Sequence, residues 1–227
     1  MDIENNERVN VKKTDKVIFL GGGGFAIELF QYMKFDGYSV YGYYDLHEDK
    51  DLSQYIKYLG NEKEAIANNI LDKDAYYIIA IRNLKLRNRM IDFIESNSLK
   101  AGCYISDSVY LSPIAKLGKG IVAYPRAMIT GNPVVGDFLF IDSLSILSHG
   151  DKIGRNVVIG PSVIITGDCT IGNNVTFGVN SCLLPGTIIG NNCEIGIATF
   201  PPKKLKDYTT ILNTPGKEFS TKFNPNF

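Results

Sequence analysis

An apolar residue, nearly always a large one, returns every six positions through the second half of the chain. Glycine often follows the members of this series directly, and a second, usually smaller residue such as Val163 or Cys169 comes four positions after many of them. Amphipathic helices repeat about every 3.6 residues and strands about every 2, so neither produces this pattern. The members are Ile105, Leu111, Leu117, Ala123, Ile129, Val135, Ile141, Leu147, Ile153, Ile159, Ile165, Ile171, Phe177, Leu183, Ile189 and Ile195.

A period of six is typical of a parallel β-helix, in which short strands meet at corners and successive coils pair with each other. In such a coil the large residue points into the core, and the smaller one lets the chain turn. Glycine suits the corners because it adopts backbone angles that other residues resist. With three hexads in each coil, residues 105–199 predict about five coils.

The first half of the chain alternates short apolar runs with helical patterns. The first run leads into four glycines at 21–24, and Asp45 ends the second run. Alternation of this kind predicts a parallel sheet with right-handed crossovers, here about half of a doubly wound nucleotide-binding fold. We expect strands at 16–20, 39–44 and 75–81 and helices at 25–34, 62–70 and 84–97.

These patterns divide the chain into four parts. A polar stretch without the apolar core of a signal peptide comes first, and we expect it to be a flexible leader. A Rossmann-like nucleotide-sugar-binding domain and a β-helix follow, and a tail ends the chain. The expected bounds are 1–15 for the leader, 16–104 for the Rossmann-like domain, 105–200 for the β-helix and 201–227 for the tail.

Composition argues against several classes of function. The 227 residues carry a formal net charge of zero, which argues against broad electrostatic binding to nucleic acid or to anionic membranes. No stretch approaches the roughly 20 apolar residues of a membrane span, and without an export signal we expect a cytoplasmic protein. The four cysteines form no CxxC pair, so we expect neither a disulfide framework nor a metal site.

The glycine turn after the first strand is a candidate binding site. Glycines there let a phosphate approach the backbone, and the N-terminus of the next helix presents unpaired N–H groups to it. We therefore take Gly23, Gly24 and Phe25 as candidate substrate-binding residues, with Asp45 placed to accept hydrogen bonds from ribose hydroxyls or a base. The alternative is that the glycines only make a tight strand-to-helix turn.

Arg82 and Asn83 follow the third predicted strand, at the same edge of the sheet as the glycine turn. Ligands of open α/β sheets bind at that edge, which makes both residues candidates for substrate binding. They are explained equally well as solvated residues at the start of a helix.

Of the two histidines, His149 is the candidate catalytic base. It stands at a predicted coil corner that points out of the core, where a histidine can act as a general base near neutral pH. His47 lies in a charged stretch and is expected to be an exposed loop residue. Gly167 follows His149 by 18 residues, one predicted coil, so the two backbones should lie about 4.8 Å apart. The Gly167 N–H is then placed to donate to an oxyanion while the imidazole takes a proton.

Two aspartates stand near the candidate base. Asp151 falls on an inward position, where a carboxylate is costly unless it is hydrogen-bonded or paired. It is expected either to orient His149 or to cap nearby backbone N–H groups. Asp142 follows Ile141 on the strand that leads toward His149, and it is expected either to touch substrate or to serve the corner.

Four segments carry a further resemblance: FLGGGGFAIE at 19–28, SILSH at 145–149, GVNSCLLPG at 178–186 and NTPGK at 213–217. Together they resemble the bacterial nucleotide-sugar N-acetyltransferases of the hexapeptide-repeat family, such as UDP-4-amino-sugar and GDP-perosamine acetyltransferases, and the sialic acid O-acetyltransferase-like proteins. The resemblance implies a left-handed β-helix, a homotrimer, and acetyl-CoA bound between the coils of neighbouring subunits. It also implies that the front domain holds the nucleotide of the sugar substrate.

The resemblance implies roles for individual residues. His149 matches the family's catalytic base, and Gly167 matches the amide that holds the acetyl carbonyl. It also places Gly178 and Val179 in the acetyl-CoA groove. The cations expected to meet the phosphates of coenzyme A are Lys203, Lys204 and Lys217.

Three positions depart from the family pattern. Gly150 stands where the family usually carries Glu or Asp, so the carboxylate that would orient His149 is open, with Asp151 as the candidate replacement. Asp142 stands at a position that is often Asn, and Arg82 at one that is often Gly, which leaves the nucleotide open.

The leading hypothesis is direct transfer of an acetyl group from acetyl-CoA to the amine of a nucleotide-linked amino sugar, such as a 4-amino-4,6-dideoxy sugar, for a bacterial surface glycan or glycoprotein. No cysteine is placed for an acyl-enzyme, so we expect a ternary complex. A second hypothesis is O-acetylation of sialic acid or a surface polysaccharide, and a third is a nucleotide-sugar sensor without turnover. An NAD-dependent oxidoreductase does not fit, because no second Rossmann half remains once the coils are assigned.

Overall fold

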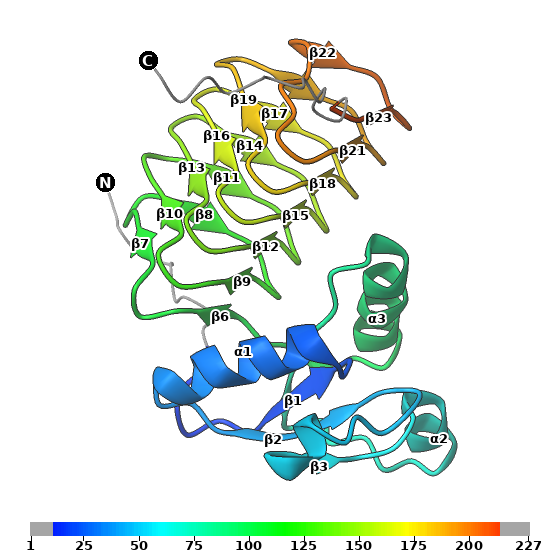
Figure 1. Ribbon diagram of the computed structural model, residues 1–227. Coiled ribbons are helices and arrows are strands. Elements are labelled where there is room, and N and C mark those ends of the chain that lie inside the picture. Colours follow the sequence, from blue (N-terminus) through cyan, green and yellow to red (C-terminus); the bar gives the residue numbers. More distant parts are fainter. Residues whose placement is uncertain (1–10, 214–227) are drawn as a thin grey trace, which may run out of the picture.

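The computed structural model describes residues 11–213, which form a small α/β domain and a tall β-helix (Figure 1). The elements of the α/β domain are β1 Val17–Leu20, α1 Gly24–Phe35, β2 Val40–Tyr44, the 3-10 helix η1 Leu52–Gln54, β3 Lys57–Tyr58, α2 Glu62–Ala67, β4 Tyr76–Ile79, α3 Leu84–Ser96 and β5 Lys100–Ala101. Its strands form one sheet in the order β3-β2-β1-β4-β5, and every pair in it is parallel, as the sequence predicts. The short strands β3 and β5 were not predicted. Among the described residues, no helix is long and apolar enough to cross a membrane.

The two faces of this sheet bury different partners. On one face, Phe19 of β1 and Leu29 of α1 share a core with Tyr104 and Phe140 of the β-helix, so α1 lies between the sheet and the coils (Figure 1). On the other face, Ile18 of β1 packs in a core with residues of α2 and α3. The α/β domain is therefore fixed to one side of the β-helix by apolar packing rather than by a linker alone.

The second half of the chain winds into coils whose short parallel strands stack into three sheets. Sheet 1 contains β6 Tyr104–Ile105, β9 Val122–Ala123, β12 Phe140–Ile141, β15 Val158–Ile159, β18 Thr176–Phe177, β21 Glu194–Ile195 and β23 Thr210–Ile211. Sheet 2 contains β7 Tyr110–Leu111, β10 Met128–Ile129, β13 Ile146–Leu147, β16 Ile164–Ile165 and β19 Cys182–Leu183. Sheet 3 contains β8 Lys116–Leu117, β11 Val134–Val135, β14 Lys152–Ile153, β17 Thr170–Ile171, β20 Ile188–Ile189 and β22 Lys204–Leu205.

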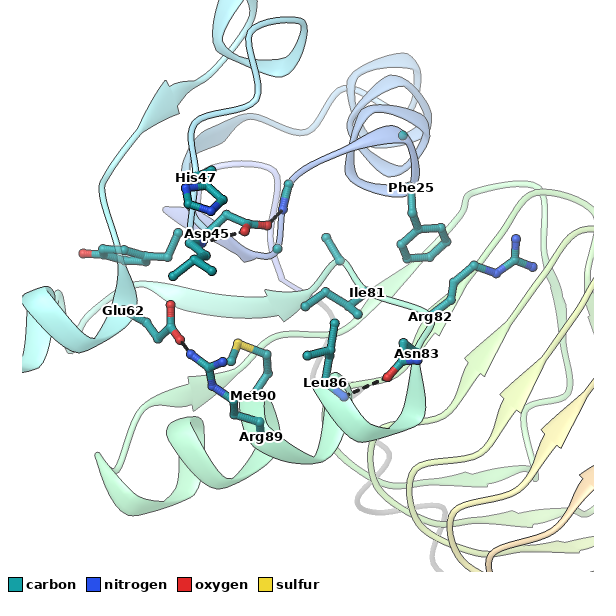
Figure 2. A pocket seen from close by; sticks show the side chains of 16 residues that line it. Phe25, Asp45, His47, Glu62, Ile81, Arg82, Asn83, Leu86, Arg89 and Met90 are labelled. Atoms are coloured by element: carbon teal, nitrogen blue, oxygen red, sulfur yellow. Dashed lines mark hydrogen bonds and ion pairs between the residues drawn. The ribbon is translucent and has the colours of Figure 1, made fainter.

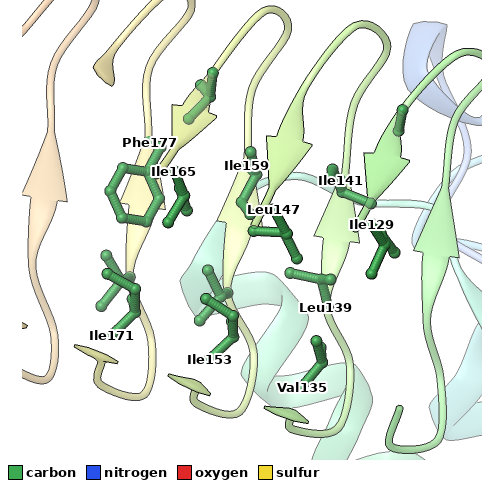
Figure 3. Close-up of a cluster of buried hydrophobic side chains, with 14 of the residues drawn as sticks. Ile129, Val135, Leu139, Ile141, Leu147, Ile153, Ile159, Ile165, Ile171 and Phe177 are labelled. Carbon is green, nitrogen blue, oxygen red and sulfur yellow. The ribbon is translucent and has the colours of Figure 1, made fainter. Parts of the chain in front are cut away.

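The hexad series forms the core of the coils. Each strand pairs with the strand 18 residues later, as Ile129 pairs with Leu147 and Leu147 with Ile165. All three of these side chains are fully buried, and Figure 3 shows them stacked inside the coils. The smaller residue of the repeat is buried as well, as at Val163 and Cys169, and all four cysteines are free thiols. The predicted β-helix is confirmed.

The ends of the described chain differ from the predicted bounds. Val11 falls in the predicted flexible leader, yet its side chain is buried and its N–H donates to the Cys103 carbonyl at 3.1 Å. At the other end, β22 and β23 lie beyond the predicted limit at residue 200 and pair with β20 and β21. Strand pairing and apolar contact thus extend both parts past the point where the sequence pattern fades.

Three edges separate the sheets, and each carries different residues. The 1–2 edge joins sheet 1 to sheet 2 and includes 142–145 and 178–181. The 2–3 edge includes 148–151 and 166–169, and the 3–1 edge includes 136–139 and 154–157. The α/β domain covers the lower part of sheet 1, so the 2–3 edge lies on the far side of the coils from it.

Arg87 of α3 is the main polar connection between the two parts. The side chain is 1% exposed, and its guanidinium donates to Asn156 Oδ1 at 2.8 Å, to the Phe138 carbonyl at 2.7 Å and to the Ile81 carbonyl at 3.0 Å. Burial lowers the pKa of Arg87 to about 10, so the group stays charged near neutral pH. Its removal would leave two buried acceptors and one partly buried acceptor without this donor.

We therefore expect Arg87→Met to destabilise the protein by about 3 kcal/mol, because methionine fills the space but satisfies none of these acceptors. Urea unfolding followed by circular dichroism measures this loss. Lys85→Met, on the exposed face of the same helix, is the matched control and should change stability little. Equal midpoints for both variants would contradict this account of the domain contact.

Candidate active site

A pocket of about 530 Å3 opens at the carboxyl ends of β1, β2 and β4 (Figure 2). Gly24, Phe25, Asp45, Arg82 and Asn83 all line it. Figure 2 shows Phe25 and Arg82 at the end nearest the β-helix and Asp45 further away. The structure thus gathers five of the six residues that the sequence proposed for substrate binding; the sixth caps the helix behind them.

The sixth residue, Gly23, is the N-cap of α1 and has a φ of 88°. No side chain caps this helix end, and its first turn contains no acidic residue. The first N–H groups of α1 therefore face the pocket unopposed, which is the arrangement that binds a phosphate. Asp45 closes the turn beside them, because its carboxylate accepts the Gly22 N–H and the Leu46 N–H, both at 2.5 Å.

Apart from Asn83, the residues of α3 that line the pocket were not predicted from the sequence. Asn83 caps this helix by accepting the Leu86 N–H at 3.1 Å, and Met90 lines the pocket one turn further on. Arg89 forms an ion pair with the largely buried Glu62 at the end of the pocket away from the coils (Figure 2). The spacing of residues 83, 86 and 90 puts them on one face of a helix, a signal that was present in the sequence.

Arg82 does not stand free in the pocket, because it forms an ion pair with Asp142 at 2.5 Å. Its guanidinium also lies 5.5 Å from the Phe25 ring centre and 5.4 Å from that of Phe140. Asp142 is 4% exposed, and burial raises the pKa of its carboxyl group. This pair joins the front domain to the 1–2 edge.

A second groove of about 540 Å3 continues from Arg82 and Asn83 along sheet 1. It is lined by Gly178 and Val179 at the 1–2 edge, two of the residues assigned to the acetyl-CoA groove. Glycines at the corner let a ligand approach the backbone closely. The two hollows share Arg82, so together they form one continuous track from the front domain onto the coils.

His149 lies at the 2–3 edge with its side chain 70% exposed. Gly167 lies one coil above, and a Cβ added to it would overlap the imidazole, at 2.8 Å from Nδ1. Only glycine therefore leaves room for the ring. Within the described residues nothing accepts a hydrogen bond from the Gly167 N–H, so this donor is available to a ligand.

Asp151 caps backbone N–H groups rather than binding the imidazole. It is fully buried, and its carboxylate accepts the Ser148 N–H at 2.7 Å and the Cys169 N–H at 2.9 Å. Burial raises the pKa of Asp151 to about 6, with the two N–H groups acting in the opposite direction. Of the two sequence interpretations, the capping role is the one that the hydrogen bonds show.

A different carboxylate lies beside the imidazole. Asp168 Oδ2 is 3.9 Å from His149 Nδ1, and the Asp168 N–H donates to the His149 carbonyl at 2.8 Å. The carboxylates proposed from the sequence, Asp142 and Asp151, are on the same coil as His149, and Asp168 was not among them. The 18-residue period places Asp168 directly above Gly150, which is the signal that identifies it.

The lysines assigned to coenzyme A lie partly within the described residues. Lys203 is exposed directly before β22 and Lys204 is exposed as the first residue of β22 in sheet 3; the Lys203 carbonyl accepts the Ile188 N–H at 2.8 Å. They belong to the third coil above His149, which at about 4.8 Å per coil is a rise of roughly 14 Å. Lys217 lies outside the described residues.

Comparison with known proteins relates both halves of the chain to characterised folds. Residues 16–94 match the family model of the PglD N-terminal domain. The front part of this chain is therefore similar to the PglD N-terminal domain. No curated protein sequence matches the chain.

Solved structures match the front domain and the coils together. PerB from Caulobacter crescentus, in complex with CoA and GDP-perosamine, has a TM-score of 0.78 at 21% identity, over 90% of this chain and 97% of its own. The acetyltransferase domain of PglB from Neisseria gonorrhoeae, in complex with acetyl coenzyme A, has a TM-score of 0.79 at 19% identity, over 90% and 98%. WeeI from Acinetobacter baumannii has a TM-score of 0.77 at 19% identity, over 90% and 99%. These matches establish the fold, a half-Rossmann domain followed by a left-handed β-helix.

In a single chain the candidate groups lie at separate edges. The pocket of the front domain and its extension reach the 1–2 edge, whereas His149 and Gly167 lie at the 2–3 edge. The width of sheet 2 separates these two groups of residues within one chain.

The buried carboxylate of Asp151 makes stability depend on pH. An unfolded aspartate ionises near pH 4, whereas folded Asp151 ionises near pH 6, so the folded state binds the extra proton between these values and loses stability as the pH rises through them. Relative to Asp151→Asn, the wild type should lose up to about 3 kcal/mol of unfolding free energy from pH 4 to pH 7. Urea unfolding of both proteins at several pH values measures the difference. A constant difference across this range would show that burial does not raise the pKa.

Proposed function

We propose that the protein transfers the acetyl group of acetyl-CoA to the amine of a nucleotide-linked amino sugar. The observation that carries this proposal is the exposed His149 imidazole, which lies against Gly167 of the next coil. The Gly167 N–H has no partner among the described residues. A base and an oxyanion donor side by side are what acyl transfer needs. The fold of PerB, which was solved with CoA and GDP-perosamine, supports the same class of substrates.

The pocket of the front domain suits a nucleoside diphosphate. The open N-terminus of α1 at Gly23 and Gly24 would hold the phosphates, and the Asp45 carboxylate would accept hydrogen bonds from the ribose. The sugar would then point along the shared track past Arg82 and Asn83 toward the coils. Because Asp142 already neutralises Arg82, the pair would contact the sugar as fixed hydrogen-bonding groups.

The chemistry follows from the two groups at the 2–3 edge. As the sugar nitrogen bonds to the thioester carbon, His149 Nε2 takes the proton that the nitrogen loses. The Gly167 N–H donates to the oxygen that gains charge. When the carbon–sulfur bond breaks, the imidazolium returns that proton to the departing thiolate. The product is the amide and free coenzyme A, without a covalent enzyme intermediate.

The acetyl-CoA would lie along the 2–3 edge. Lys203 and Lys204 stand roughly 14 Å above His149, three coils at about 4.8 Å each. An extended pantetheine arm covers a distance of this order, so the thioester would reach the imidazole while the lysines meet the phosphates. Gly178 and Val179, at the opposite edge of sheet 2, would line the groove from a neighbouring copy.

The assembly we propose is a homotrimer in which each site combines the pocket of one copy with the His149 edge of the next. Two observations support a second copy. The halves of the site lie at different edges of one chain, and the outward face of sheet 2 is a ladder of apolar side chains. The ladder consists of Tyr110, Met128, Ile146, Ile164 and Cys182. Tyr110 is 58% exposed, Met128 39% and Ile164 40%.

Replacing His149 by Ala should lower kcat by 100-fold to about 10,000-fold, because the general base is lost. Thiol release from acetyl-CoA measures turnover, with GDP-, UDP- and dTDP-linked amino sugars offered against free sialic acid. The histidine is exposed, so the variant should unfold at the same urea concentration as the wild type. Full activity of His149→Ala would contradict a base role, and turnover with sialic acid alone would contradict amine acetylation.

Mixing two inactive variants tests whether the site is shared. Gly24→Trp should block the pocket without disturbing the backbone, because a Cβ there meets no protein atom within 4 Å and the pocket leaves open space beyond it. Co-refolded in equal amounts, Gly24→Trp and His149→Ala should recover about one quarter of wild-type activity, since that fraction of neighbour pairs joins an intact pocket to an intact histidine. Each variant refolded alone is the control. No recovery in assemblies shown by sizing to be mixed would place the whole site in one chain.

A further inference from the structure

Asp168 lies in the coil above His149, and its carboxylate occupies the space over Gly150. A Cβ on Gly150 would lie 3.1 Å from Asp168 Cγ and would overlap Oδ1. The other carboxylate oxygen, Oδ2, is 3.9 Å from His149 Nδ1. A side chain at position 150 and this carboxylate therefore compete for the same place beside the imidazole.

Another corner aspartate shows what such a residue does when its role is structural. Asp137, at the 3–1 edge, accepts the N–H of Lys119 at 2.9 Å. Lys119 stands 18 residues earlier, one coil below, so this carboxylate ties two coils together. Asp168 occupies a different position of its corner, because it is itself left-handed with a φ of 63°, whereas Asp137 precedes the left-handed Phe138.

Asp168 does not make that bond. The equivalent donor, the Gly150 N–H, bonds instead to Asn132 Oδ1 at 3.0 Å, in the coil below. Within the residues that the structure describes, no backbone N–H donates to the Asp168 carboxylate. The polar side chain nearest to this carboxylate is the imidazole, at 3.9 Å from Oδ2 to Nδ1.

The other groups around the imidazole do not offer a competing partner. On its own coil the Asp151 carboxylate is buried and already accepts two backbone N–H groups. In the coil below, Gly131 and Asn132 carry no charge. Among the described residues, Asp168 is thus the carboxylate placed to act on the Nδ1 side of the ring.

We propose that Asp168 is the positioning residue for His149, an inference that rests on the acetyl transfer proposed above. By accepting the Nδ1–H, it keeps the proton on that nitrogen and leaves Nε2 free to take the proton of the amine. Both side chains are about 70% exposed, so a small rotation closes 3.9 Å to hydrogen-bond distance, and such contacts are often long before substrate binds. An exposed pair adds little to stability, so the effect belongs to turnover.

The test uses Asp168→Asn, which removes the charge, and Asp168→Gly, which removes the side chain and suits the local φ of 63°. We expect kcat to fall by about 10-fold to 100-fold in the glycine variant, with the KM for acetyl-CoA within about two-fold, as for residues that orient a functional histidine. Asp137→Asn changes a corner aspartate far from His149 and is the control, which should keep wild-type kcat.

A second readout does not depend on substrate. The chain has two histidines, so 15N-histidine labelling with His47→Gln as the assignment variant gives the signals of His149 alone. In the wild type, neutral His149 should carry its proton on Nδ1. In Asp168→Gly, it should shift toward the Nε2–H form that free imidazole side chains prefer in water.

The outcomes separate this inference from the proposed function. If His149→Ala loses turnover while both Asp168 variants keep wild-type kcat, the positioning role is wrong and the acetyl transfer stands. If His149→Ala is as active as the wild type, both proposals fall. An unchanged tautomer in Asp168→Gly overturns the positioning role, whatever the kinetics show.

Discussion

The stacking of one coil on the next, 18 residues apart, is the constraint on which this structure depends. Fully buried side chains such as Leu147 and Ile165 hold the coils in that register, and a shift of one position would turn every apolar side chain outward. The same register sets the 2–3 edge. It places Gly167 over the ring of His149 and Asp168 over Gly150, so the candidate chemistry is a consequence of core packing.

The contact between the two parts adds a second constraint. Arg87 and the aromatic core on sheet 1 fix the pocket of the front domain against one side of the coils. His149 lies beyond sheet 2, at the edge remote from that contact. Firm packing inside one chain therefore separates the pocket from the base, and the apolar face of sheet 2 lies between them. A complete site then calls for a neighbour, which is why oligomerisation and catalysis are linked in the proposal.

Periodic features could be predicted from the sequence, because each depends on spacing along the chain. The hexads gave the coils, and one step of 18 residues from His149 gave Gly167. The pairing of Arg82 with Asp142 could not be predicted, because it depends on how the front domain sits on sheet 1. The choice between two roles for Asp151 also needed coordinates. The same 18-residue step, applied to residue 150, would also have placed Asp168 beside the corner of His149.

The buried carboxylate of Asp151 is costly, but it makes two hydrogen bonds, one of which connects neighbouring coils. Its burial raises the pKa to about 6, so the ionised carboxylate near neutral pH is held against an opposing free energy. In return, one oxygen holds the Ser148 N–H, next to His149, and the other holds the Cys169 N–H, two residues after Gly167. The carboxylate thus joins the two corners that carry the proposed base and the proposed oxyanion donor. An apolar residue would fill the same space at lower cost, but the two corners would then lose their common anchor.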